Sequence, residues 1–309
     1  MEIYLPIAEQ PVNILLILGM SAAVGFISGM FGVGGGFLMT PFLIFTGIPP
    51  AIAVASVSAQ IAGSSMTGVL TYWRKRAVDV RLGGVLIGGG AVGTFLGVLF
   101  FNQMRRLGHL ELVIVLSYVV LFSVIGGLML LESVKALFET RGAQPAQKTA
   151  HPRTRPWYFE LPLRIRFQRS RMAASIIPIA LLAVGVAFAG AVLGIGGGFI
   201  LVPALIYLFH VPTAVVIGTS LMQILATMLV ATILHATTNQ SVDLILATLL
   251  IVGGVIGAQF GARAGQNLRA EVFRLLLALM VLGVGLRFAS EIVVRPNDPF
   301  SVRVEHRAR

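Results

Sequence analysis

Two glycine-rich segments, each set between apolar stretches, are the parts of the sequence best suited to binding chemistry. Residues 32–41 read GVGGGFLMTP, and residues 194–203 read GIGGGFILVP. Glycine tolerates positive φ, so each segment predicts a break before a helix whose first N–H groups are unpaired and whose dipole favours an anion. The predicted anion-binding residues are Gly34, Gly35, Gly36, Phe37, Gly196, Gly197, Gly198 and Phe199. The alternative interpretation is that these glycines only permit tight helix packing.

Amide and hydroxyl side chains lie in the apolar stretch that follows each glycine segment. Gln60 and Thr67 lie on one face of a predicted helix, and Gln223 is the counterpart of Gln60. Such groups either hydrogen-bond a polar solute or join helices to one another. A buried amide needs several partners, which favours solute binding for the two glutamines. The predicted substrate-binding set therefore also contains Ser56, Gln60, Thr67, Thr219, Ser220 and Gln223.

The composition is that of a membrane protein. Of the 309 residues, 57% are hydrophobic and only 11% are charged, against about 25% charged residues in soluble domains. No Asp, Glu, Lys or Arg occurs from residue 10 to 73 or from 172 to 242, and each window is longer than the roughly 20 residues that cross a bilayer. The net charge of +11 is assigned to loops that orient the helices, and not to nucleic-acid binding.

Three titratable residues are candidates for coupling to protons or cations. Asp79 and Asp243 each precede an apolar stretch, where aspartate commonly caps a helix N-terminus. His235 ends an apolar stretch beside Thr237, Thr238 and Asn239. That context favours a solvated histidine at the membrane interface, with a proton relay as the alternative.

No catalytic or cofactor motif accompanies these groups. A P-loop places Lys-Ser or Lys-Thr after its glycines, whereas Phe37-Leu38 and Phe199-Ile200 stand there in this chain. A Ser/His/acid set, an HExxH motif and paired intramembrane carboxylates do not occur, and cysteine is absent. We therefore expect no enzyme activity and no cofactor or metal.

The glycine segments belong to an internal repeat that organises the whole chain. The register difference is 162 residues (194 − 32), and Asp79 and Asp243 follow it with a small slip. Internal duplication of this size is typical of transporters built from two related halves. The predicted divisions are a first half at 10–131, a basic cytoplasmic linker at 132–173, a second half at 174–290 and a polar tail at 291–309.

Apolar runs predict an all-α polytopic fold. Eight long runs are expected to span the bilayer, and two shorter runs after the glycine segments are re-entrant or half helices; the long runs are 12–31, 51–73, 82–101, 110–131, 174–193, 213–235, 242–261 and 271–290, and the short ones 37–48 and 199–211. Eight spans place both termini and the linker in the cytoplasm, which suits the distribution of basic residues. The alternative is ten spans as inverted repeats of five.

The duplicated GxGGGFxxxP blocks, together with Tyr72-Trp73-Arg74-Lys75-Arg76 leading to Val78-Asp79, resemble the sulfite exporter TauE/SafE family over about residues 14–288. The resemblance implies export of small sulfur-containing anions, such as sulfite or organosulfonates, across the cytoplasmic membrane. The expected partners are a small anionic substrate and the lipid bilayer. A passive anion channel and a non-transporting membrane scaffold are the alternatives.

Overall fold

The computed structural model describes residues 2–31, 35–139, 164–167, 170, 172–209, 211–264 and 270–293. A short β-hairpin precedes the helices of each predicted repeat half, and the second hairpin lies almost entirely within the predicted linker 132–173. The first half contains β1 (Glu2–Leu5), β2 (Gln10–Asn13), α1 (Ile14–Phe31), α2 (Gly36–Phe45), α3 (Pro50–Arg74), α4 (Val80–Arg106) and α5 (Leu110–Glu139). The second contains β3 (Arg164–Phe167), β4 (Met172–Ser175), α6 (Ile176–Leu193), α7 (Gly198–Tyr207), α8 (Thr213–Leu234), the π-turn η2 (His235–Asn239), α9 (Leu244–Ala264) and α10 (Ala270–Val293).

The helices agree with a polytopic membrane protein. Six described helices are long and apolar enough to cross a bilayer: α3, α4, α5, α6, α8 continued by η2, and α9. α1, α2 and α10 supply shorter apolar segments. The all-α prediction is confirmed for the membrane part, whereas the two antiparallel hairpins, β1–β2 and β3–β4, are not foreseen by the hydrophobic pattern.

Two compact units make up the chain, and neither coincides with a repeat half. One unit contains α1 to α4, α6 to α9 and both hairpins, and the other contains α5 from Val115 together with α10. Within the second unit, the rings of Tyr118 and Phe288 stack at 5.4 Å between centroids. The predicted linker 132–173 lies largely outside the described residues, although α5 extends through its first eight positions to Glu139.

Inside the larger unit, each half packs its first helix against the fourth helix of the other half. A Cβ built on Gly93 of α4 would lie 2.8 Å from the carbonyl carbon of Val184 in α6, and one on Gly257 of α9 would lie 2.8 Å from that of Ala22 in α1. The two contacts are related by 162 residues (184 − 22) and 164 residues (257 − 93). Glycines therefore bring the helix backbones together at equivalent places, as small-residue packing in membranes requires.

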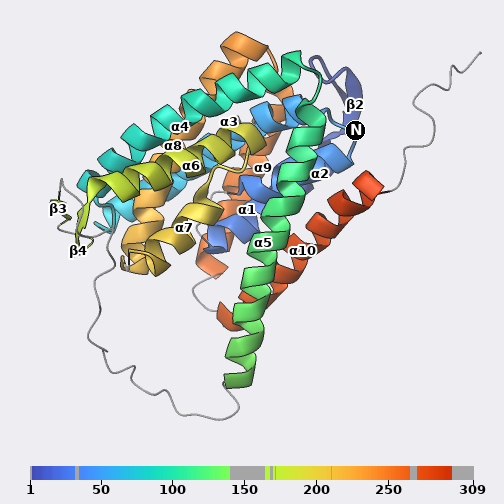
Figure 1. The fold of residues 1–309 in the computed structure, drawn as a ribbon. Helices are drawn as coiled ribbons and strands as arrows, with labels where there is room; N and C mark the ends of the chain where they lie inside the picture. Colours follow the sequence, from blue (N-terminus) through green and yellow to red (C-terminus); the bar gives the residue numbers. More distant parts are fainter. Residues whose placement is uncertain are drawn as a thin grey trace, which may run out of the picture. The chain divides into compact units, whose positions relative to one another are not determined.

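The equivalent helices α3 and α8 run in opposite directions. Gly68 of α3 faces Leu221 of α8, and the later residue Tyr72 faces the earlier residue Gly218. The hairpins that open the two halves accordingly lie at opposite ends of the long helices α3, α4, α6 and α8 (Figure 1).

Candidate functional site

Both glycine segments form breaks of the predicted kind. α2 begins after Gly35, which has φ 72°, and α7 begins after Gly197, which has φ 77°. Gly194 ends α6 with φ 67°, and its N–H donates to the Gly190 carbonyl at 2.8 Å, so it is a left-handed C-cap. These torsions explain the requirement for glycine. Gly34, the remaining predicted glycine of the first break, lies outside the described residues.

The two breaks meet in the interior of the larger unit. The rings of Phe37 and Phe199, each in the first turn of its short helix, stack with centroids 4.5 Å apart and planes at 7°. Thr40 Oγ1 donates to the Gly194 carbonyl at 3.2 Å. The N-terminal turns of α2 and α7, each carrying partial positive charge, therefore lie together.

The two glutamines are buried, Gln60 beside Gly254 of α9 and Gln223 beside Gly90 of α4. Gln60 is 2% exposed, and its Nε2 donates to Ser21 Oγ at 3.1 Å, while Ser21 donates to the Leu250 carbonyl at 2.6 Å. Gln223 is 0% exposed, and both ends of its amide lack a hydrogen-bond partner among the described residues. The difference follows from the repeat, because the counterpart of Ser21 in the second half is Ala183 (183 − 21 = 162).

The remaining predicted polar residues divide between structural contacts and unpaired groups. Ser56 Oγ accepts from the Asp243 N–H at 3.2 Å, and Thr219 Oγ1 accepts from the Asp79 N–H at 3.1 Å. Thr67 is half-buried and donates to the Ser64 carbonyl of its own helix at 2.8 Å. Ser220 is buried, and its hydroxyl has no partner in the described part of the chain.

Asp79 and Asp243 are helix N-caps that also hold the hairpin of the other half. Asp79 accepts from the N–H groups of Arg81 and Leu82 in α4 and, through its second oxygen, from the N–H and hydroxyl of Ser170 at 2.9 and 2.8 Å. Asp243 caps α9 and accepts from the Ile7 N–H at 3.0 Å. A coupling role for either carboxylate stays a prediction.

The electrostatic state of Asp79 follows from these donors. Burial raises the pKa of its carboxyl group, but the two hydrogen bonds from Ser170 and those from the Leu82 and Arg81 N–H groups outweigh it and lower the pKa below its usual value. Hydrogen bonds that stabilise the charged form act in this direction. Asp79 is therefore a stable carboxylate near neutral pH.

His235 is not the solvated interfacial residue that the sequence favours. Its side chain is 0% exposed, and its ring lies edge-on to Phe101 at 4.7 Å between centroids. Nε2 lies 3.2 Å from the Ala191 carbonyl, and Nδ1 lies 3.0 Å from the Asn239 amide nitrogen. An acceptor at Nε2 and a donor at Nδ1 suit a neutral ring protonated on Nε2. The prediction was wrong because the fold packs this ring against Phe101 and the Ala191 carbonyl.

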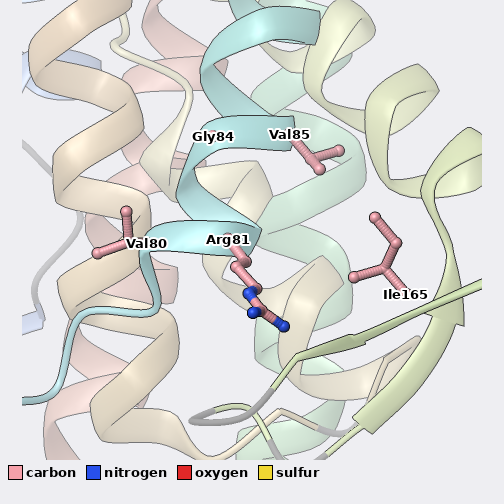
Figure 2. A pocket seen from close by; sticks show the side chains of 5 residues that line it. All are labelled: Val80, Arg81, Gly84, Val85 and Ile165. Atoms are coloured by element: carbon pink, nitrogen blue, oxygen red, sulfur yellow. The ribbon is translucent and has the colours of Figure 1, made fainter.

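An open pocket lies where α4 begins, beside the second hairpin. Val80, Arg81, Gly84 and Val85 of α4 and Ile165 of β3 line it, and the Arg81 side chain extends from α4 toward the strand (Figure 2). No residue of the predicted substrate-binding set lines this pocket.

Some buried polar residues of α1 and α4 are not recognisable from the sequence. Ser21, Ser28 and Thr94 are buried in α1 and α4, and Thr94 Oγ1 has no partner among the described residues. A single hydroxyl in an apolar helix is common in membrane proteins. The repeat does not mark these residues as polar positions either, because their counterparts in the second half are Ala183, Gly190 and Ala258.

Buried helix breaks, an internal repeat and several apolar spans define a polytopic membrane protein of the transporter class. The model of the family described as "Sulfite exporter TauE/SafE" matches residues 17–288, and the chain belongs to this family. "Probable membrane transporter protein YjnA" of Bacillus subtilis (strain 168) is 28% identical, covering 88% of this chain and 98% of that protein. A "Probable membrane transporter protein" of Xylella fastidiosa (strain Temecula1 / ATCC 700964) is 27% identical, covering 89% and 94%. No solved structure gives a significant match.

Proposed function

We propose that this transporter carries a small sulfur-containing oxyanion outward across the cytoplasmic membrane. The observation that carries the proposal is the meeting of the α2 and α7 N-termini, where Phe37 stacks on Phe199 at 4.5 Å. Two helix N-termini that point at one place form a site for negative charge. The family name supplies the sulfur chemistry of the substrate.

Burial and charge agree with an anion held by dipoles. Among the buried described residues there is no Lys or Arg, so no buried cationic side chain is available to pair with the substrate. The buried amides of Gln60 and Gln223 are uncharged donors. Backbone N–H groups and amides bind an anion without the strong pairing of a buried salt bridge, which favours release as well as binding.

The helix directions support ten crossing segments arranged as inverted repeats. α3 and α8 are repeat counterparts, yet they run antiparallel, which two parallel halves would not give. With five segments per half, the N-terminal hairpin and the central linker are on opposite sides. Arg74, Lys75, Arg76 and Arg81 lie on the linker side, so we assign that side to the cytoplasm and the N-terminal hairpin to the opposite side.

The function is tested by flux in proteoliposomes that contain the purified protein. The panel is sulfite, sulfate, thiosulfate, sulfoacetate and taurine, and we expect uptake of at least one sulfur oxyanion above that of empty liposomes. Accumulation against a substrate gradient identifies a carrier and contradicts the passive channel. Absence of flux for every member of the panel contradicts the proposal and favours the scaffold.

A glycine variant connects flux to the helix breaks. Gly197→Val forces a β-branched residue into φ 77°. Its Cβ would lie 2.5 Å from Cγ1 of Val186. We expect loss of flux with membrane insertion retained. Gly185→Val is the matched control, since a Cβ at Gly185 meets nothing within 4 Å. Full flux in the Gly197→Val protein contradicts a role for the break.

A further inference from the structure

The two glycine breaks repeat in sequence but differ in the side chains that surround them. A Cβ on Gly35, in the first break, would lie 3.2 Å from both Cβ and Oγ of Ser28. The counterpart of Ser28 is Gly190 (190 − 28 = 162). A Cβ on Gly190 would lie 3.4 Å from the Gly197 nitrogen and 3.4 Å from the Met228 methyl carbon. A hydroxyl therefore adjoins the first break, and a thioether side chain adjoins the second.

A second difference lies on the face of α3 that contacts the breaks. The Ile61 side chain contacts Gly36, and it would lie 2.9 Å from a Cβ on Gly196. Ser65 is one turn further along the same face, is 1% exposed, and has a hydroxyl without a partner among the described residues. The counterpart of Ser65 in the second half is Met228 (228 − 65 = 163).

The crossing of α3 and α8 adds a third polar group on the same side. Leu221 Cδ1 would lie 2.8 Å from a Cβ on Gly68. Ser220 adjoins Leu221, and Ser65 is three residues from Gly68, so both lie on this side of the antiparallel crossing. Ser220 is 0% exposed, and its hydroxyl is also unpaired within the described chain. The equivalent positions on the other side are Met228 and Val57 (220 − 57 = 163).

We propose that the transporter binds one anion per chain, at the first break only. The proposed site consists of the N-terminal turn of α2 with the hydroxyls of Ser28, Ser65 and Ser220. On the other side, Met228 adjoins the second break, and Val57 is the repeat counterpart of Ser220. This inference rests on the proposed function and places the substrate on one side of the region where the α2 and α7 N-termini meet, the side of the first break.

Hydroxyl chemistry explains why these serines mark a ligand site. The unpaired buried hydroxyls of Ser65 and Ser220 are unfavourable, and the cost is removed when they donate to a bound oxyanion. Hydrogen bonds to an ionised acceptor are shorter and stronger than those between neutral groups. Three hydroxyls and the first N–H groups of α2 can donate hydrogen bonds to more than one oxygen atom of such an anion.

The test is equilibrium binding of [35S]sulfite to the purified protein in nanodiscs. We expect one sulfite per chain for the wild type. Ser65→Met places in the first half the side chain that the second half has, and we expect affinity to fall by about tenfold or more. Met228→Leu keeps the volume of an apolar side chain and is the matched control, with unchanged affinity expected.

Ser65→Ala separates loss of the hydroxyl from added volume. This variant adds no volume, so we expect the fold to be kept, with an unchanged elution profile and unfolding temperature, and we expect a several-fold loss of affinity. Wild-type affinity in both Ser65 variants, or two sulfites per chain, overturns the one-sided site while leaving the proposed function intact. No sulfite binding to the wild type overturns the one-sided site for sulfite, and failure of flux for the whole panel overturns the proposed function as well.

Discussion

Replacing Asp79 with alanine is expected to destabilise the protein, while the folded fraction retains transport. The variant loses the N-cap of α4, which contributes about 1 kcal/mol. It also loses two hydrogen bonds from Ser170, at 2.9 and 2.8 Å, which contribute about 1.5 kcal/mol each to a charged acceptor. The loss of about 4 kcal/mol corresponds to a decrease in Tm of roughly 8 °C, at about 2 °C per kcal/mol for a large domain.

The repeat supplies a graded comparison for this variant. Asp243 caps α9 in the same way but accepts one hydrogen bond from the opposite hairpin, from the Ile7 N–H. Asp243→Ala should therefore lower Tm by less, roughly 5 °C on the same scale. Asp79→Ser keeps a good N-cap residue but has no second oxygen for Ser170, so its Tm should lie between those of the wild type and Asp79→Ala.

Thermal unfolding of the detergent-solubilised protein, followed by fluorescence or by circular dichroism, measures these differences. Because the pKa of Asp79 is lowered in the folded protein, its contribution is present above the unfolded-state pKa of about 3.9. It is lost as the pH falls through the lowered folded-state pKa. The Tm difference between wild type and Asp79→Ala should be full at neutral pH and should shrink below about pH 4.

Flux of the Asp79 variants distinguishes a capping role of this carboxylate from a coupling role. If Asp79 acts as a cap, Asp79→Ser retains flux at temperatures where it is folded, and flux falls in parallel with the folded fraction. An Asp79 variant that is folded at the assay temperature but does not transport would refute a purely capping role and would indicate a role for the carboxylate in coupling.

The remaining predictions concern packing and topology. Gly93→Leu should prevent assembly of α4 with α6, at a cost of about 3 kcal/mol or more, because its Cβ would lie 2.8 Å from the Val184 carbonyl carbon; Gly88→Leu, where a Cβ meets nothing within 4 Å, should give normal yields of monodisperse protein, and equal yields from both variants would contradict the packing. Since the chain has no cysteine, Glu9→Cys and Lys75→Cys each provide a single thiol. An impermeant maleimide should label them from opposite sides of the membrane, and labelling of both from one side would contradict inverted repeats.

Local sequence rules are sufficient for the features that arise within one segment. The positive φ at Gly35 and Gly197 and the caps at Asp79 and Asp243 follow from neighbouring residues. Apolar run length likewise predicts the long helices, since a bilayer requires a minimum length whatever the partners. The hydrophobic pattern does not predict the hairpins, because four-residue strands are too short to give a periodic pattern.

Contacts between distant residues could not be predicted in this way. His235 is buried because Ala191 and Phe101 surround it, and neither is near it in sequence. Each aspartate binds the hairpin of the other half, with Ser170 and Asp79 separated by 91 residues. Periodicity identifies the apolar or polar face of a helix, but it does not identify the helix that packs against that face.

The sequence alone predicts a membrane protein of two repeated halves, each interrupted by glycines. Charge-free windows and backbone conformation are local properties, and they are sufficient for that conclusion. Only the tertiary structure decided that the two breaks meet at Phe37 and Phe199 and that α3 and α8 run antiparallel. Both facts depend on how helices from the two halves pack, and that packing brings Ser65 and Ser220 to one side of a crossing that the repeat alone would make symmetric.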